Sequence, residues 1–208
     1  MEKIKRDFFI SYLEELHNDA KCALDYNNDY ELLFAIILSA QTTDKSVNKV
    51  TPILFNKYPD IKSLSNANVI DIENIIREIG LYKNKAKNIS QASKKLVSDG
   101  YDYIPNDFNY LLSLDGVGRK TANVFLAEYY NSNTLGVDTH ILRVSKRLRI
   151  TPLNGDALVA EEKLKKFIKD YNYKKLHHLI IAFGRNECKA TRPLCDNCKF
   201  KEYCIHNK

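Results

Sequence analysis

DFNYLLSLDGVGRKTANVFLAEYY, residues 107–130, is the stretch that decides the fold predicted for this chain. Leucines end its first half, and apolar residues at helical spacing mark its second half (Ala122, Phe125, Leu126, Tyr129). Between the halves lies Gly116-Val117-Gly118, and glycine is the residue that a tight turn tolerates best. The stretch therefore predicts two helices joined by a short turn.

Such a turn has two possible uses. The first N–H groups of the second helix have no partner within the helix, and the positive end of the helix dipole lies behind them. A phosphate oxygen suits that position, and Arg119 and Lys120 add positive charge beside it. Gly116, Val117, Gly118 and Arg119 are therefore candidate contacts to a DNA backbone, which would be held without reading its sequence. The alternative is a plain turn between two packed helices.

The rest of the chain also favours helices. Apolar residues recur at helical spacing and the alternation typical of strands is scarce, so the predicted class is all-α. The further predicted helices cover 3–19, 29–40, 44–57, 68–79, 84–98, 139–148, 156–170 and 173–183. Asp29 and Asp44 are the predicted N-caps of two of these helices, and Gly80 and Gly100 are the predicted ends of two others.

Composition narrows the class of protein. The chain has 208 residues, 44% of them hydrophobic and 28% charged, with a formal charge of +6, as in a globular protein with a mild preference for polyanions. The longest purely apolar run, residues 32–38, is far shorter than the roughly 20 residues of a membrane span. The amino terminus has no apolar segment typical of a secretory signal. We therefore expect a cytoplasmic protein without a membrane partner.

Two residues could carry chemistry on DNA. Lys120 falls in the first turn of its predicted helix, where the dipole lowers the cost of losing a proton, and a neutral amine can attack a sugar carbon. The alternative is a lysine that only binds phosphate. Asp138, in Val-Asp-Thr-His, precedes an apolar-periodic segment and is a predicted N-cap. Backbone N–H groups would also keep it ionised, so that it could accept a proton or stabilise positive charge.

Four of the five cysteines crowd the end of the chain, at Cys188, Cys195, Cys198 and Cys204. Four thiolates can hold tetrahedral zinc or a [4Fe–4S] cluster. Structural zinc sites often use two Cys-x-x-Cys pairs, whereas this chain has only Cys195–Cys198. The longer gaps favour iron–sulfur over zinc.

These motifs in this order resemble the endonuclease III family of DNA glycosylases. The carried motifs are LSAQTTD (38–44), IGLYKNKA (79–86), LDGVGRKTANV (114–124), VDTHILRV (137–144) and the four cysteines. The resemblance implies two helical lobes with a DNA-binding cleft between them. One is a six-helix, barrel-like lobe over 22–132 that includes a helix-hairpin-helix motif at 107–130. The other is an iron–sulfur lobe of 1–21 plus 133–208, with the cluster loop at 188–204.

The resemblance also implies the site. Lys120 matches the family's Schiff-base lysine and Asp138 its aspartate; Gln41 matches the residue that fills the gap left by an extruded base, and Leu81 a wedge in the opposite strand. The implied cofactor is a [4Fe–4S] cluster on the four cysteines. The implied activity is removal of oxidised or damaged pyrimidines from double-stranded DNA, followed by cleavage at the abasic site. We expect a monomer associated with the nucleoid.

Three other functions compete with this interpretation. An adenine or mismatch glycosylase of the same superfamily usually lacks the lysine and carries a further domain. A non-catalytic iron–sulfur DNA-binding protein would not need both Lys120 and Asp138, and a zinc-bound DNA module would need a different metal. One residue departs from the family, because Asp115 stands where proline is usual. A carboxylate there should repel DNA, unless it bonds to backbone N–H groups of the turn.

Overall fold

The computed structural model describes residues 4–207, and within this range all regular structure is helical. The all-α prediction is confirmed. Residue 3, where the first predicted helix begins, lies outside the described residues. No helix in the described range is long and apolar enough to cross a membrane. The α-helices are α1 (Arg6–His17), α2 (Asp29–Leu38), α3 (Asp44–Lys57), α4 (Ile61–Ser65), α5 (Val69–Ile75), α6 (Tyr82–Ser98), α7 (Phe108–Leu112), α8 (Arg119–Tyr130), α9 (Thr139–Arg147), α10 (Ala157–Phe167) and α11 (Tyr173–Asn186). Two short 3-10 helices follow, η1 (Lys201–Tyr203) and η2 (Ile205–Asn207).

The chain divides into two compact units. The first combines Met1–Cys22 with Asn133–Lys208, and the second is Ala23–Ser132. Helices α1 and α9 to α11 belong to the first unit, and α2 to α8 belong to the second. The short α4, which the sequence did not predict, begins with a capping box at Asp60 and Ser63.

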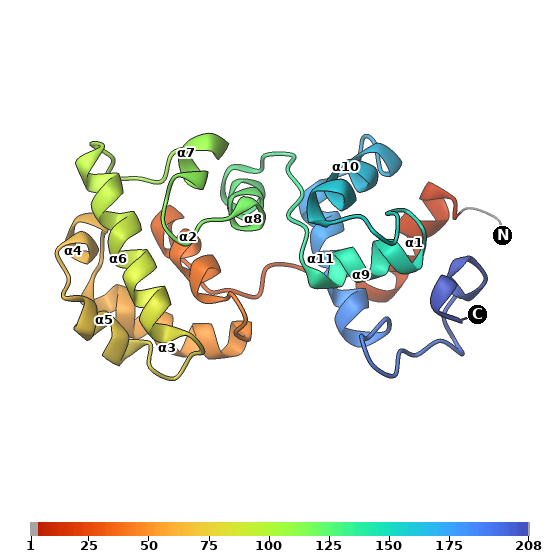
Figure 1. Ribbon diagram of the computed structural model, residues 1–208, viewed down its shortest axis with the longest axis horizontal. Coiled ribbons are helices and arrows are strands. Elements are labelled where there is room, and N and C mark those ends of the chain that lie inside the picture. The colour runs from red at the N-terminus through yellow and green to blue at the C-terminus, as the bar shows by residue number, and fades with distance from the viewer. Residues whose placement is uncertain (1–3, 208) are drawn as a thin grey trace. The chain divides into compact units, whose positions relative to one another are not determined.

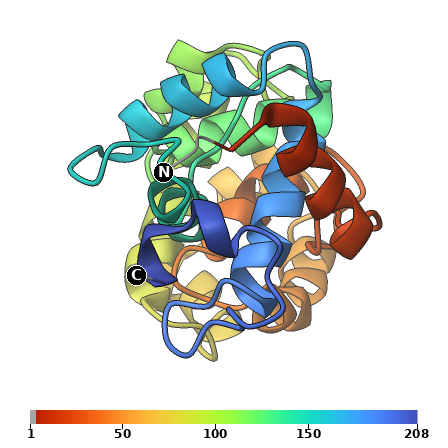
Figure 2. The same ribbon diagram turned by 90° about the vertical axis from the view of Figure 1, so that its right-hand side faces the viewer.

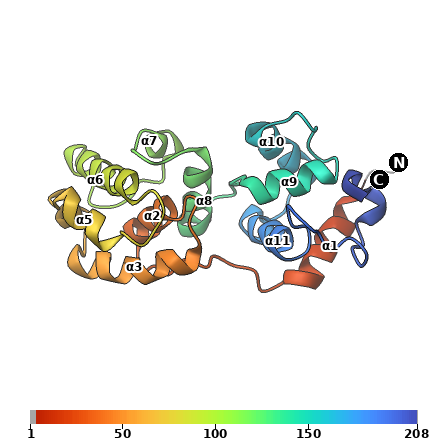
Figure 3. The same ribbon diagram turned by 60° about the horizontal axis from the view of Figure 1, so that its bottom comes forward.

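Helix α2 is the centre of the second unit. It contacts α3, α6 and α8 (Figure 3), and every residue from Tyr30 to Leu38 is buried. A helix that is apolar all round is stable only when neighbours cover all of its faces. Helix α8, the second helix of the predicted hairpin, covers one of these faces (Figure 1). The core of this unit therefore fixes the position of the hairpin.

The first unit packs α1 and α9 against α11. Phe200, from the segment after α11, is fully buried and its ring contacts those of Phe9, Tyr12 and Phe183. Figure 2 shows this segment, in blue, leaving α11 as a long loop that ends in the two 3-10 helices. Aromatic packing around Phe200 therefore anchors the cysteine-bearing loop to the helical core.

Two predicted N-caps were each wrong by one residue. The side chain of Asn28 caps α2 by accepting the N–H of Glu31, and the side chain of Thr43 caps α3 by accepting the N–H of Ser46. Asp29 instead accepts the N–H of Ile104 at 2.6 Å. An Asx or Thr residue before an aspartate can take the cap, which leaves the aspartate in the first turn, where the dipole also favours it.

Of the two glycines that were predicted to end helices, one does so and the other does not. Gly100 (φ +84°) ends α6 in a Schellman motif, in which Tyr101 N–H bonds to Leu96 O at 2.9 Å. Gly80 does not end a helix in this way, because α5 stops at Ile75. The left-handed residue is instead the next one, Leu81.

Candidate functional site

The hairpin turn requires glycine at only one of its two glycine positions. Gly116 has φ +79°, and a Cβ there would lie 2.9 Å from Asn88 Cβ and 3.1 Å from Ile37 Cγ2. Gly118 has φ −94°, and a Cβ there would meet no atom within 4 Å. Val117 is buried and its N–H bonds to Leu114 O at 3.1 Å. The turn is thus packed on one side, toward α2 and α6, and open at Gly118.

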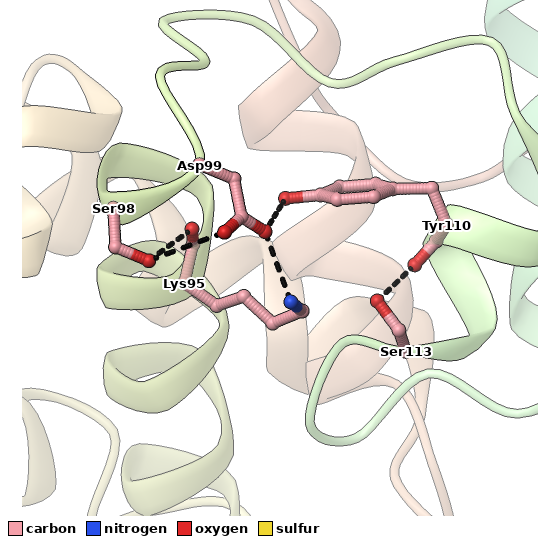
Figure 4. Close-up of polar contacts among 5 residues, drawn as sticks. All are labelled: Lys95, Ser98, Asp99, Tyr110 and Ser113. Atoms are coloured by element: carbon pink, nitrogen blue, oxygen red, sulfur yellow. Dashed lines mark hydrogen bonds and ion pairs between the residues drawn. The ribbon is translucent and has the colours of Figure 1, made fainter.

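The first hairpin helix, α7, is tied to the end of α6 (Figure 4). Tyr110 Oη donates to Asp99 Oδ2 at 2.9 Å, and Lys95 Nζ bonds to the same oxygen at 2.9 Å. These hydrogen bonds, the one from Lys95 first, lower the pKa of Asp99. Ser113 Oγ bonds back to Tyr110 O at 2.7 Å, where α7 ends. This surface network fixes the position of α7 against the end of α6, and with it the start of the hairpin turn.

Lys120 lies at the second position of α8, as the sequence predicted. No side chain caps the amino end of α8, where Gly118 is the N-cap. Lys120 is partly buried, and among the described residues its ammonium has no hydrogen-bond or ion-pair partner. Arg119 is exposed, with its guanidinium 5.1 Å from the centre of the Phe108 ring. The start of α8 therefore presents amide groups, a positive charge and an amine at one place.

Asp138 is the N-cap of α9, which confirms that expectation. Its Oδ1 accepts the N–H of Ile141 at 2.8 Å. His140 is bonded through Nδ1 to Arg143 Nη2 at 3.2 Å, and burial lowers the pKa of His140 although the charge of Asp138 acts the other way. Asp138 belongs to the first unit and Lys120 to the second.

Gln41 and Leu81 share an unusual feature within the second unit. Both are exposed, and both have the left-handed backbone that side chains other than glycine rarely adopt, with φ 53° for Gln41 and 58° for Leu81. This conformation costs roughly 1–2 kcal/mol per residue, so the surrounding loops must hold it. Leu81 is 56% exposed and is the N-cap of α6. Strain of this kind concentrates at functional sites.

The four terminal cysteines surround one hollow in the first unit. Cys188, Cys195, Cys198 and Cys204 line this hollow together with apolar residues that include Phe183 and Phe200. All four thiols are free. Burial raises the pKa of the Cys198 and Cys204 thiols, so binding of a metal there must release protons. Among the described residues, no three metal-binding side chains converge on a point that would suit a single ion.

Two arginines that the sequence analysis did not single out hold the cysteine loop. Arg147 Nη1 bonds to Cys188 Sγ at 3.3 Å and to Lys189 O at 2.7 Å, and its Nη2 bonds to Ala190 O at 3.2 Å. Arg143 Nε bonds to Cys188 O at 3.1 Å. Their spacing, one turn apart on α9, was the available signal, but nothing local in the sequence reveals partners more than 40 residues away.

Asp115 is exposed, and its carboxylate accepts no hydrogen bond from the residues that the structure describes. The suggestion that it bonds to turn N–H groups is therefore wrong. Its charge lies free beside the hairpin.

Comparison with known proteins assigns the family. A family model described as "HhH-GPD superfamily base excision DNA repair protein" matches residues 34–170. Among curated proteins, endonuclease III of Bacillus subtilis is 38% identical over 95% of this chain and 90% of its own length. Endonuclease III of Escherichia coli K12 is 37% identical over 100% of this chain and 98% of its own length.

Solved structures agree. A non-covalent endonuclease III–DNA complex and a trapped covalent endonuclease III–DNA intermediate each superpose with a TM-score of 0.93, at 38% identity, over 98% of this chain and 97% of theirs. A thermostable thymine-DNA glycosylase shares the fold, with a TM-score of 0.86 at 20% identity. The chain therefore belongs to the endonuclease III family of the HhH-GPD superfamily. The predicted family and the predicted enzyme class, a DNA glycosylase and abasic-site lyase of base excision repair, are confirmed.

Proposed function

We propose that this enzyme removes oxidised pyrimidines from duplex DNA and then nicks the abasic strand through a Schiff base on Lys120. The observation that carries the proposal is the position of Lys120, in the first turn of an uncapped helix directly after the hairpin turn. A cation there opposes the helix dipole, so this position does not serve stability. The similar structure of a trapped covalent intermediate supports a covalent route.

In the proposed reaction, the neutral amine of Lys120 adds to C1′ as the bond from C1′ to the base breaks and the base leaves with the electron pair. Asp138 takes a proton from the amine or stabilises the positive charge that develops on the sugar. The sugar then opens to a Schiff base with Lys120. Loss of a C2′ proton expels the 3′ phosphate oxygen, and water releases the lysine. The proposal requires Lys120 and Asp138 to reach one deoxyribose when DNA is bound.

DNA is held by its backbone at the hairpin in this proposal. The N–H groups of Gly118 and of the first turn of α8, with the charge of Arg119, bind phosphate oxygens, whereas Val117, whose N–H bonds to Leu114 O, only packs the turn. Gln41 fills the space of the extruded base and Leu81 separates the opposite strand. Their exposure and left-handed backbone support these roles. A damaged base pairs poorly, so its extrusion costs less than that of an intact base.

We propose that Cys188, Cys195, Cys198 and Cys204, which line one hollow, hold a [4Fe–4S] cluster and not one zinc ion, because structural zinc sites often use two Cys-x-x-Cys pairs and only Cys195–Cys198 forms one here. A cubane binds each thiolate to a different iron, whereas zinc needs all four sulfurs about 2.3 Å from one centre. The cluster would cross-link the loop after α11 and so shape a surface that carries Lys189 and Arg192. No step of the proposed reaction passes through it.

A lesion lies in one strand and has no twofold symmetry, so one copy of the enzyme suffices. We therefore propose a monomer that acts on the chromosome, in the cytoplasm and associated with the nucleoid.

The test uses two duplexes, one with a thymine glycol and one with an abasic site. Incubation with borohydride should trap a covalent enzyme–DNA adduct on both, and strand cleavage should follow in its absence. Lys120→Gln should abolish trapping and cleavage on both duplexes. Undiminished trapping in that variant would remove Lys120 from the proposed role. Activity on the abasic duplex alone would contradict the proposed glycosylase substrate.

A further inference from the structure

Lys85 is a buried lysine that the proposed chemistry does not use. It is 4% exposed and lies in the first turns of α6, on the same face as the core residue Ile89. Its Nζ donates to Thr42 Oγ1 at 2.6 Å, and no carboxylate of the described residues lies within ion-pair distance of it. Burial lowers the pKa of Lys85. A lone buried cation near the amino end of a helix is unfavourable for stability, so its presence needs another reason.

Lys85 connects the two loops that carry Gln41 and Leu81. Its backbone N–H bonds to Leu81 O at 3.1 Å, while its side chain bonds to Thr42, the neighbour of Gln41. The Thr42 hydroxyl in turn bonds to Ala40 O at 3.4 Å, on the other side of Gln41. The Lys85 side chain is thus linked through the Thr42 hydroxyl to Ala40 O, and the Lys85 backbone N–H bonds to Leu81 O in the first turn of α6.

The two loops also lie close together at Gly80. A Cβ on Gly80 would lie 3.9 Å from Gln41 O and 4.0 Å from Thr42 Oγ1, which is ordinary contact distance. The exposed residues on either side of this contact, Gln41 and Leu81, both hold the left-handed backbone that needs support from its surroundings. The link from Lys85 to Thr42 supplies such support to both loops at once.

We propose that Lys85 is a positioning residue that acts through Thr42 to hold Gln41 and Leu81 at a fixed separation, so that they enter the DNA together when a base is extruded. This role rests on the proposed function of Gln41 and Leu81. Lys85 does not touch DNA, because its side chain is buried. Its loss should therefore weaken base extrusion without changing the chemistry of Lys120 or the count of phosphates bound.

The test compares Lys85→Met and Thr42→Val with the wild type. Extrusion is followed by the fluorescence of 2-aminopurine placed opposite a thymine glycol, and excision is measured under single-turnover conditions. Each variant should lose extrusion and excision by about tenfold or more, the range for a hydrogen bond to a charged group. Cleavage at a pre-formed abasic site, where no base has to leave the stack, should change little. Thr42→Ser keeps the hydroxyl and should retain extrusion.

Two controls separate this role from general stability. Lys94→Met removes an exposed lysine from the same helix and should leave extrusion unchanged. The double variant Lys85→Met/Thr42→Val should be no worse than either single variant, because both remove one link. Additive losses would overturn the proposal. Equal losses on the thymine glycol and abasic duplexes, or a reduced salt dependence of binding, would also overturn it, since they indicate a structural or a phosphate-binding lysine.

Fluorescence reports extrusion whether or not the base is cut. Normal extrusion in both single variants would contradict the positioning role of Lys85 and would leave the proposed glycosylase function unaffected. A wild type that extrudes the base but never excises it would contradict the proposed function and leave the positioning role supported by the variants.

Discussion

Replacing Gly116 with alanine tests whether the hairpin turn depends on a single glycine. The new Cβ would have to lie in the left-handed region, at φ +79°, and 2.9 Å from Asn88 Cβ. That neighbouring atom is fixed to the backbone of α6, so it cannot rotate away. The left-handed backbone costs roughly 1–2 kcal/mol, and overpacking in a filled site typically costs about 1–3 kcal/mol.

We therefore expect Gly116→Ala to lower the free energy of unfolding by about 2–5 kcal/mol. Gly118→Ala is the matched control, two residues away in the same turn. Its φ is −94° and its Cβ would meet nothing within 4 Å. Only the weaker N-cap preference of alanine remains, a loss of about 1 kcal/mol or less.

Urea unfolding of the two variants beside the wild type measures this difference, with the free energy taken from the midpoint and slope of each transition. Binding to an undamaged duplex should weaken with Gly116→Ala, because the turn that presents the N–H groups is displaced. The reasoning is refuted if Gly116→Ala is no less stable than Gly118→Ala.

Three further changes have definite expected outcomes. Asp115→Pro should tighten binding to duplex DNA and leave excision under single-turnover conditions unchanged, because it removes an exposed charge and stiffens the turn; equal or weaker affinity counts against this. Arg147→Met should speed the loss of iron and of visible absorption under chelator, compared with Lys146→Met on the same helix, because it removes the bonds to Cys188 and the following carbonyls; identical decay in the two variants would exclude this anchoring role. The hydrogen bond from Lys175 lowers the pKa of Glu14, so its contribution to stability is present above the unfolded pKa and is lost as the pH falls through the folded pKa; Glu14→Gln should therefore flatten the fall of Tm with acid, and an unchanged acid profile would show that the pair contributes nothing.

The sequence predicted the parts of this protein whose cause is local. Helices α2 and α6 lie close to their predicted ranges, because α2 is a nearly continuous apolar run that is buried on all faces and α6 has one apolar face. The prediction of Asp138 as an N-cap was correct because no competing cap residue precedes it. Asp29 and Asp44 were wrong because Asn28 and Thr43 directly precede them and take the cap.

Features with distant causes could not be predicted from the sequence. A left-handed leucine is so uncommon that nothing local indicated this backbone conformation at Leu81, although the resemblance singled out the residue. Gly116 and Gly118 look alike in sequence, yet backbone conformation and the positions of α2 and α6 distinguish them. The role of Lys85 was not predicted, because it depends on a distant residue, Thr42. A lysine one turn before Ile89 on an apolar face was nevertheless a usable signal.

The site of covalent attachment tests the central claim most directly. Borohydride-reduced adduct on an abasic duplex would be digested with nuclease and protease, and the modified peptide identified by mass spectrometry. The account predicts that the deoxyribose remnant is carried by the Nζ of Lys120. Attachment to any other lysine or to the amino terminus, with Lys120 unmodified, would contradict it.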